Sequence, residues 1–291
     1  MKRILSLFLV ITMLSNAGFA LALNEGEART VIGADLTAEQ INQVYNAFGI
    51  TRDDVRELVV TNAEERQYLE GLIDSNIIGS RSISCVYVEI RGADSGIDVS
   101  TTNINWCTDV TYRNALATAG ISDAKVIVAA PFGVSGTAAL TGIYKAYEDI
   151  TGTKLDETAK LVGTQELVVT GELADQIGDV DAASIVNELK YILDETVNMT
   201  DDEIREEIRR IAQQYDVSIS DGIIDQLVKL CREMEGLSAD ELKAKVESVQ
   251  KSLKSLAGAQ ESAGKAVNSI KNFFTAVGNF FSNIFNKVTG K

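Results

Sequence analysis

A strand–helix–strand unit in the middle of the chain constrains its fold most strongly. Residues 97–104 are rich in β-branched side chains, and residues 124–130 form a short apolar run typical of a buried strand. Between them, Asp109 can cap a helix that reaches Ala119, and Gly120 follows where helices often end. Two strands joined by such a helix form a right-handed parallel crossover. The sequence therefore predicts a sheet with at least one parallel pair.

Other segments before residue 180 fit the same domain. Capping boxes at Thr37 and Thr61 predict helices that reach residue 48 and residues 72–73. Further predicted elements are strands over residues 55–60 and 82–90 and helices over residues 137–150 and 155–177. The turn-rich segment 91–96 predicts a hairpin between strands 82–90 and 97–104. We therefore predict an α/β (α+β) domain over residues 23–180 with a small mixed sheet.

One pentapeptide within residues 155–177 is compatible with a strand as well as with the predicted helix. Glu-Leu-Val-Val-Thr at residues 166–170 is β-prone, and it also occurs at residues 57–61. A shared pentapeptide is weak support for an internal duplication.

After residue 180 the periodicity is helical throughout. The predicted helices cover residues 183–196, 200–215, 220–234 and 238–256. Capping boxes at Thr200 and Ser238 begin two of them. We therefore predict an α-helical C-terminal region over residues 181–257.

The first 22 residues have the pattern of a secretory signal peptide. Lys2 and Arg3 precede a short apolar run, and Ala20-Leu21-Ala22 offers small residues at a cleavage point. The apolar run is too short for a comfortable membrane span. Residues 1–22 are therefore predicted to be removed after Ala22, which places the protein outside the cell or at the cell surface.

Residues 265–288 form a strongly amphipathic pattern. Apolar side chains recur every three or four residues, and Lys, Asn and Ser occupy the other face without an acid. This pattern predicts a tail helix with a membrane or partner face formed by Phe274, Val277, Phe281 and Ile284. The stripe can insert into a membrane surface, bind another protein, pack in an oligomer, or fold back on the protein's own body.

Charge and composition exclude several classes of function. The net charge is −15, and without the six cations of the two ends residues 23–264 carry −21. So acidic a body repels nucleic acid, and we expect no nucleic-acid partner. The chain has no histidine, which removes Ser-His-Asp and Cys-His catalysis and histidine-bound zinc. No acidic cluster has the spacing of a calcium loop, so we predict no metal and no cofactor.

The three cysteines, Cys85, Cys107 and Cys231, are each compatible with a free thiol. In the predicted hairpin Cys107 lies about 17 Å along the strand from the partner of Cys85. A disulfide needs Cα atoms within about 7 Å, so the pair fits only with a bulge or another strand order. Cys231 shares a helical face with Leu227 and Leu230, which indicates a core position.

The segment of residues 131–141 is the best candidate for a binding site. Glycines between a strand and a helix can expose backbone N–H groups to an anion, so we predict ligand or anion contacts at Gly133, Ser135, Gly136 and Thr137. The spacing fits neither a Walker loop nor a nucleophile elbow, and a simple tight turn is the alternative. A carboxylate-dependent hydrolase centred here is the rival function. Two converging carboxylates would favour it, whereas a flat, carboxylate-free loop would favour a binding module.

Several of these stretches together resemble a known family. They are residues 32–37, 60–65, 68–71, 104–105, 114–120, 130–142 and 166–171, of which Ala-Pro-Phe followed by Ser-Gly-Thr-Ala-Ala-Leu-Thr-Gly is the most specific. They are similar to the YpuA-like exported bacterial proteins, a family of unknown function (domain of unknown function 1002), over about residues 25–235. The resemblance implies export from a bacterium and transfers no activity and no catalytic residue.

These observations predict an exported cell-envelope protein that binds or scaffolds. We assign it no catalytic residue, and its expected partners are a membrane surface or a protein, reached through the C-terminal helix.

Overall fold

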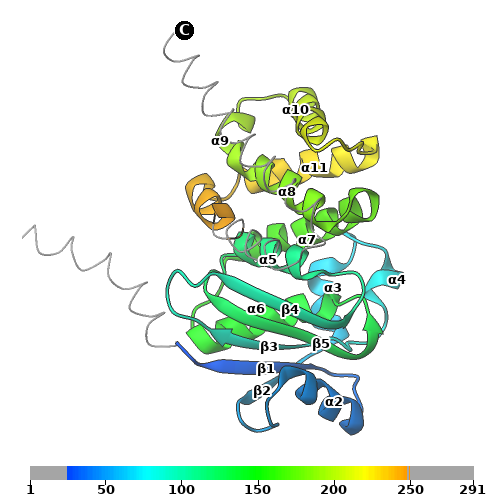
Figure 1. Cartoon of the computed structure of the whole chain (residues 1–291), viewed down its shortest axis with the longest axis vertical. Coiled ribbons are helices and arrows are strands. Elements are labelled where there is room, and N and C mark those ends of the chain that lie inside the picture. Colours follow the sequence, from blue (N-terminus) through cyan, green and yellow to red (C-terminus); the bar gives the residue numbers. More distant parts are fainter. Residues whose placement is uncertain (1–24, 248, 250–291) are drawn as a thin grey trace, which may run out of the picture.

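The computed structural model describes residues 25–247 and 249. It contains a five-stranded mixed sheet with helices stacked on it (Figure 1). The strands are β1 (Ala28–Gly33), β2 (Arg56–Val60), β3 (Cys85–Ile90), β4 (Ile97–Ile104) and β5 (Ala124–Val134). Their order across the sheet is β2-β1-β3-β5-β4. The β1–β2 and β4–β5 pairs are parallel, and β3 runs antiparallel to both of its neighbours. The small mixed sheet is therefore confirmed.

The predicted crossover is present, but the predicted hairpin is wrong. Helix α5 (Asp109–Thr118) connects β4 to β5, and Thr108 rather than Asp109 is its cap. Strand β5 lies between β3 and β4, so Val128 is opposite Val86 on one side and Thr101 on the other. The apolar β5 takes the interior position, whereas β4 exposes polar side chains and is suited to an edge. Strand β1 has no counterpart among the elements predicted from the sequence.

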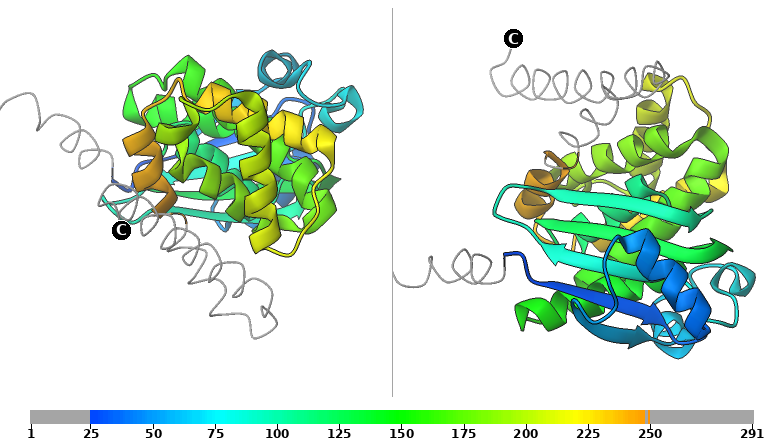
Figure 2. Two further views of the ribbon diagram at one scale, coloured as in Figure 1. Left: turned by 90° about the horizontal axis from the view of Figure 1, so that it is seen from above. Right: turned by 60° about the horizontal axis from the view of Figure 1, so that its bottom comes forward.

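Helices cover the two faces of the sheet unequally. On one face lies α2 (Ala38–Phe48), visible across the sheet in the right-hand view of Figure 2. Its buried side chains Val44, Tyr45 and Phe48 pack on the strands, and the capping box at Thr37 is present as predicted. On the other face α5 and α6 (Thr137–Thr151) pack against a valine-rich core that includes Val31, Val86, Val88, Val126 and Val128.

A helical layer lies beyond α5. Its helices are α7 (Glu157–Ile177), α8 (Asp179–Tyr191), α9 (Leu193–Thr196), α10 (Asp201–Gln214) and α11 (Asp221–Met234), followed by helical residues 239–247. Leu173, Ile185, Leu189, Ile204 and Leu227 are among the buried residues of its own core. Residues 181–247 are mostly helical, as predicted, and α7, which the sequence analysis placed in the α/β domain, contributes Leu173 to the same core. None of the helices in residues 25–247 and 249 is long and apolar enough to cross a membrane.

Two short helices differ from what the sequence predicts, and a repeated pentapeptide adopts two conformations. Helix α3 (Asn62–Leu69) ends earlier than predicted, and the short α4 (Ser75–Ile78) follows it. Residues 166–170 are helical within α7, whereas the identical residues 57–61 contain most of β2. Tertiary context thus decides the conformation of this pentapeptide.

All three cysteines are free and buried. Cys231 lies in the core of the helical layer, as predicted. Burial raises the pKa of Cys85 and of Cys107 to about 12, so both remain neutral thiols at physiological pH.

A buried carboxyl in α8 makes stability depend on pH. Glu188 accepts a hydrogen bond of 2.6 Å from the Tyr215 hydroxyl, and burial raises its pKa from 4.5 to about 7. Between pH 4.5 and 7 the folded protein therefore holds a proton that the unfolded chain releases, and the free energy of unfolding falls as pH rises. We expect Glu188→Gln to stabilise the protein by about 2 kcal/mol at pH 8 and to have little effect at pH 4.5.

Urea unfolding at the two pH values measures this difference. Glu206→Gln, at an exposed position of α10, is the control and should show no such pH dependence. Equal effects of Glu188→Gln at both pH values would contradict the account.

Candidate functional site

The strand-to-helix connection is shorter than the sequence indicates. Residues 131–134 continue β5, so Gly133 lies in the strand, and Ser135 and Gly136 alone connect it to α6. Gly136 has φ 98°, and a Cβ there would lie 2.6 Å from both Ile104 Cγ2 and Tyr112 Oη. Glycine is therefore required at this turn.

This turn forms one wall of a pocket of about 590 Å³. Of the four residues predicted to contact a ligand or anion, Ser135, Gly136 and Thr137 line this pocket, whereas Gly133 is not one of its lining residues. The other walls come from α3, from α4 and the segment after it, and from the residues that follow β4. They include Glu65, Asn76, Ser80, Arg81, Ser84, Asn105 and Trp106.

A buried carboxylate that sequence analysis missed is the main polar group of this pocket. Glu65 of α3 is 1% exposed and accepts hydrogen bonds from Thr137 (2.5 Å) and Asn62 (3.1 Å). The Thr137 hydroxyl donates to Glu65, so its 3.1 Å contact with Ser135 is a hydrogen bond that Ser135 donates. The hydroxyl hydrogens thus all point toward the carboxylate, and the lone pairs of Ser135 remain free to accept.

Contacts made by Arg66 hold Glu65 in position. Arg66 donates to the Asn62 side-chain oxygen (3.1 Å) and to the Gly79 carbonyl (2.6 Å). It therefore orients the amide that bonds Glu65 and ties α3 to the segment after α4. Both contacts set the shape of the pocket.

Glu65 has no cationic partner within ion-pair distance in the described part of the chain. Burial raises its pKa, while the hydrogen bonds from Thr137 and Asn62 and the charge of Arg66 oppose that rise. A carboxylate buried without a counter-cation is costly unless something else compensates it. A ligand group that carries hydrogen-bond donors could do so.

Arg81 is the second charged residue of the pocket lining, and it is exposed. Its guanidinium makes neither an ion pair nor a hydrogen bond with the residues described by the structure. Phe132, 40% exposed, and the half-buried Trp106 add aromatic surface. The pocket thus combines one acid, one base, several neutral polar groups and two aromatic rings.

The pocket lining can be compared with the two functions predicted for residues 131–141, a carboxylate-dependent hydrolase and a binding module. The lining has one carboxylate, not the converging pair that the hydrolase reading requires, and it is not carboxylate-free either. The backbone N–H of Ala139 in the first turn of α6 already donates to Ser84 Oγ (3.0 Å). Glu65 places a negative group beside the same helix end. An anion from solution would meet this carboxylate.

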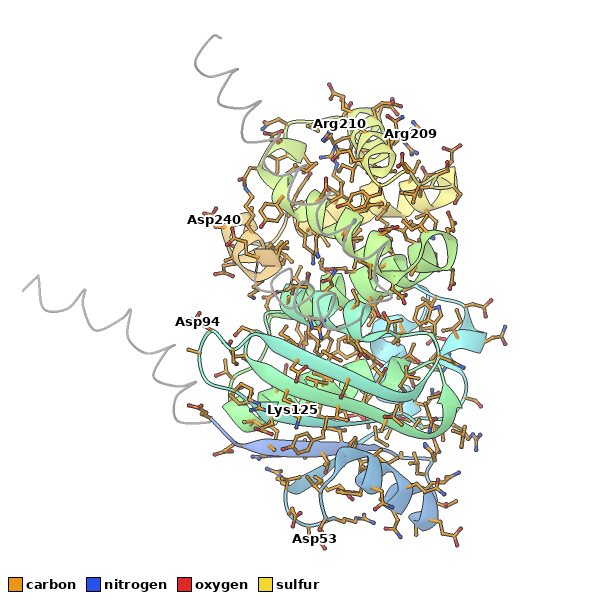
Figure 3. All side chains as sticks on the ribbon, in the orientation of Figure 1. Asp53, Asp94, Lys125, Arg209, Arg210 and Asp240 are labelled. Carbon is orange, nitrogen blue, oxygen red and sulfur yellow. The ribbon has the colours of Figure 1, made fainter. Side chains whose placement is uncertain are left out.

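The exposed acidic side chains outside the pocket are spread over the surface. Asp53, Asp94 and Asp240, labelled in Figure 3, lie at separate points of the periphery. Among residues 25–247 and 249, no group of three or more His, Cys, Asp or Glu residues is arranged to hold a metal ion. The predicted signal peptide and the predicted tail residues Phe274, Val277, Phe281 and Ile284 lie outside the described residues.

Comparison with known proteins agrees with the resemblance seen in the sequence. A family model described as "Protein of unknown function (DUF1002)" matches residues 32–256. The chain is also 36% identical over 270 residues to "Uncharacterized protein YpuA" of Bacillus subtilis (strain 168). That alignment covers 90% of this chain and 89% of the relative. No solved structure matches.

Proposed function

The chain belongs to the DUF1002 family of proteins of unknown function, and from that premise we propose that it is an exported module that binds a small polar ligand without converting it. The observation that carries the proposal is Glu65, a buried carboxylate without a cation in the wall of an open pocket. The pocket volume of about 590 Å³ is within the range of small-molecule sites. The single lining carboxylate favours binding over paired acid–base chemistry.

A thermal-shift screen on residues 23–291 tests this proposal. The panel holds amino acids and short peptides, neutral sugars, organic acids and nucleotides. At least one class should raise the melting temperature, because a ligand that binds only the folded protein stabilises it. Ser135→Trp, which fills the pocket, should abolish the shift, and Ser218→Trp, at an exposed position away from the pocket, should retain it. No shift with any class, or a shift that survives Ser135→Trp, would contradict the proposal.

We further propose that the signal peptide exports the protein and that the tail helix keeps it at a surface. The support is the sequence pattern of residues 1–22 and the apolar stripe of Phe274, Val277, Phe281 and Ile284. Burying one such side chain contributes roughly 1.5–3 kcal/mol, whereas each cation near anionic lipid adds about 1 kcal/mol, so the apolar stripe should dominate.

Cell fractionation with and without residues 265–291 measures both properties. We expect the full-length protein in the envelope fraction with Leu23 as its N-terminus, and the truncated protein in the medium. Phe274→Ser combined with Phe281→Ser should release the protein as truncation does. An intact Met1 on exported protein, or the same distribution with and without the tail, would contradict this proposal.

A further inference from the structure

We propose that the ligand of the Glu65 pocket is a zwitterion of the amino-acid or short-peptide class, with its ammonium group at Glu65 and its carboxylate at Arg81. This inference rests on the proposed binding function and names its ligand class.

Glu65 and Arg81 are the two charged residues in the lining, and they carry opposite signs. They do not pair with one another, and neither forms an ion pair with any residue that the structure describes. A ligand with one charge would satisfy one of the two and meet repulsion from the other. A neutral ligand would leave the buried carboxylate uncompensated and would gain no ion pair with Arg81, so a ligand with both charges fits best.

The acid end of the pocket is arranged to accept hydrogen bonds. Thr137 donates to one oxygen of the Glu65 carboxylate and Asn62 to the other, so each oxygen keeps acceptor capacity that these two hydrogen bonds do not use. Ser135 donates its hydrogen to Thr137, so its oxygen can accept from the same ligand group. An ammonium group has three donors and no acceptor, and it would compensate the buried negative charge.

The base end is suited to a carboxylate. Arg81 follows Gly79 by two residues, and the Gly79 carbonyl is held by Arg66 at 2.6 Å. The guanidinium is exposed, and its planar donors match both oxygens of a carboxylate. Ile77, Ile83, Trp106 and Phe132 line the same pocket and offer apolar contacts for a ligand side chain.

Isothermal titration of residues 23–291 with three probes tests the inference. The probes are trialanine, its N-acetylated form and its C-terminal amide. Trialanine should bind, and each blocked form should bind at least tenfold more weakly. In Glu65→Gln the free and the acetylated peptide should bind equally, and in Arg81→Gln the acid and the amide should bind equally. Glu70→Gln and Arg56→Gln, outside the pocket lining, should keep both preferences.

The outcomes separate this inference from the proposed function. Absence of trialanine binding, or blocked forms that bind as well as trialanine, would overturn the zwitterion. Binding of another class in the thermal-shift screen, lost in Ser135→Trp, would then still support a binding pocket. Arg81 is exposed, so its variant is expected to fold and keeps the test decisive even where Glu65→Gln perturbs the buried hydrogen bonds.

Discussion

Lys190→Met is expected to lower the free energy of unfolding by about 3–5 kcal/mol. Lys190 of α8 lies 2.6 Å from Glu166 of α7, and both side chains are almost completely buried. Thr118 of α5 donates to the other oxygen of Glu166 at 2.5 Å, so the pair connects three helices. Burial lowers the pKa of Lys190, and the charge and hydrogen bond of Glu166 oppose that fall. Without the lysine, the carboxylate would stay buried and uncompensated.

Urea unfolding at pH 7 measures this effect, with two comparison variants. Lys229→Met removes an exposed lysine from α11 and should change stability by less than about 0.5 kcal/mol. The double variant Lys190→Met/Glu166→Met should recover part of the loss, because it removes both charges at once. A loss below about 1 kcal/mol in Lys190→Met would show that the pair does not hold the three helices together.

Gly163→Ala is expected to cost about 3 kcal/mol through steric overlap. A Cβ at this position of α7 would lie 2.6 Å from the Ala115 carbonyl oxygen of α5 and 3.2 Å from Ala119 Cβ. The nearest atom belongs to the backbone, so the two helices would have to separate. This contact joins the helical layer to the helix that packs on the sheet.

Gly222→Ala is the matched control for this overlap. A Cβ at Gly222 in α11 meets nothing within 4 Å, and alanine is the better helix former. We expect Gly222→Ala to leave stability unchanged or raise it slightly in thermal unfolding. If both variants melt at the same temperature, the close approach of α5 and α7 does not require glycine at position 163, and the prediction is wrong.

Local signals predicted most of the elements, but not their arrangement. The capping boxes at Thr37, Thr61 and Thr200 begin helices because hydrogen bonds from backbone N–H groups to side-chain acceptors within four residues decide a helix start. The hairpin between β3 and β4 failed because pairing depends on which strand is apolar enough for the sheet interior. The pentapeptide at residues 57–61 and 166–170 adopts two conformations for a similar reason, since its surroundings differ.

The candidate site was predictable only on one side. Glycines after an apolar run indicated Ser135, Gly136 and Thr137, because a strand-to-helix turn leaves a local pattern. Glu65 is 72 residues away from Thr137 in the chain and follows a capping glutamate, Glu64, from which nothing in its own sequence context distinguishes it. A charge buried by tertiary packing carries no local pattern. Arg81 is exposed, and its place in the same pocket lining also depends on tertiary packing, which leaves no local pattern.

The most direct test of the central claim, that the pocket binds its ligand without converting it, is recovery of the ligand. Residues 23–291 are incubated with the compound that gives the largest thermal shift, and the compound is then quantified by mass spectrometry. The account predicts a single molecule bound per chain and full recovery of the unchanged compound. Conversion to a product at a rate above that in buffer, lost in Glu65→Gln, would contradict it and establish a carboxylate-dependent enzyme.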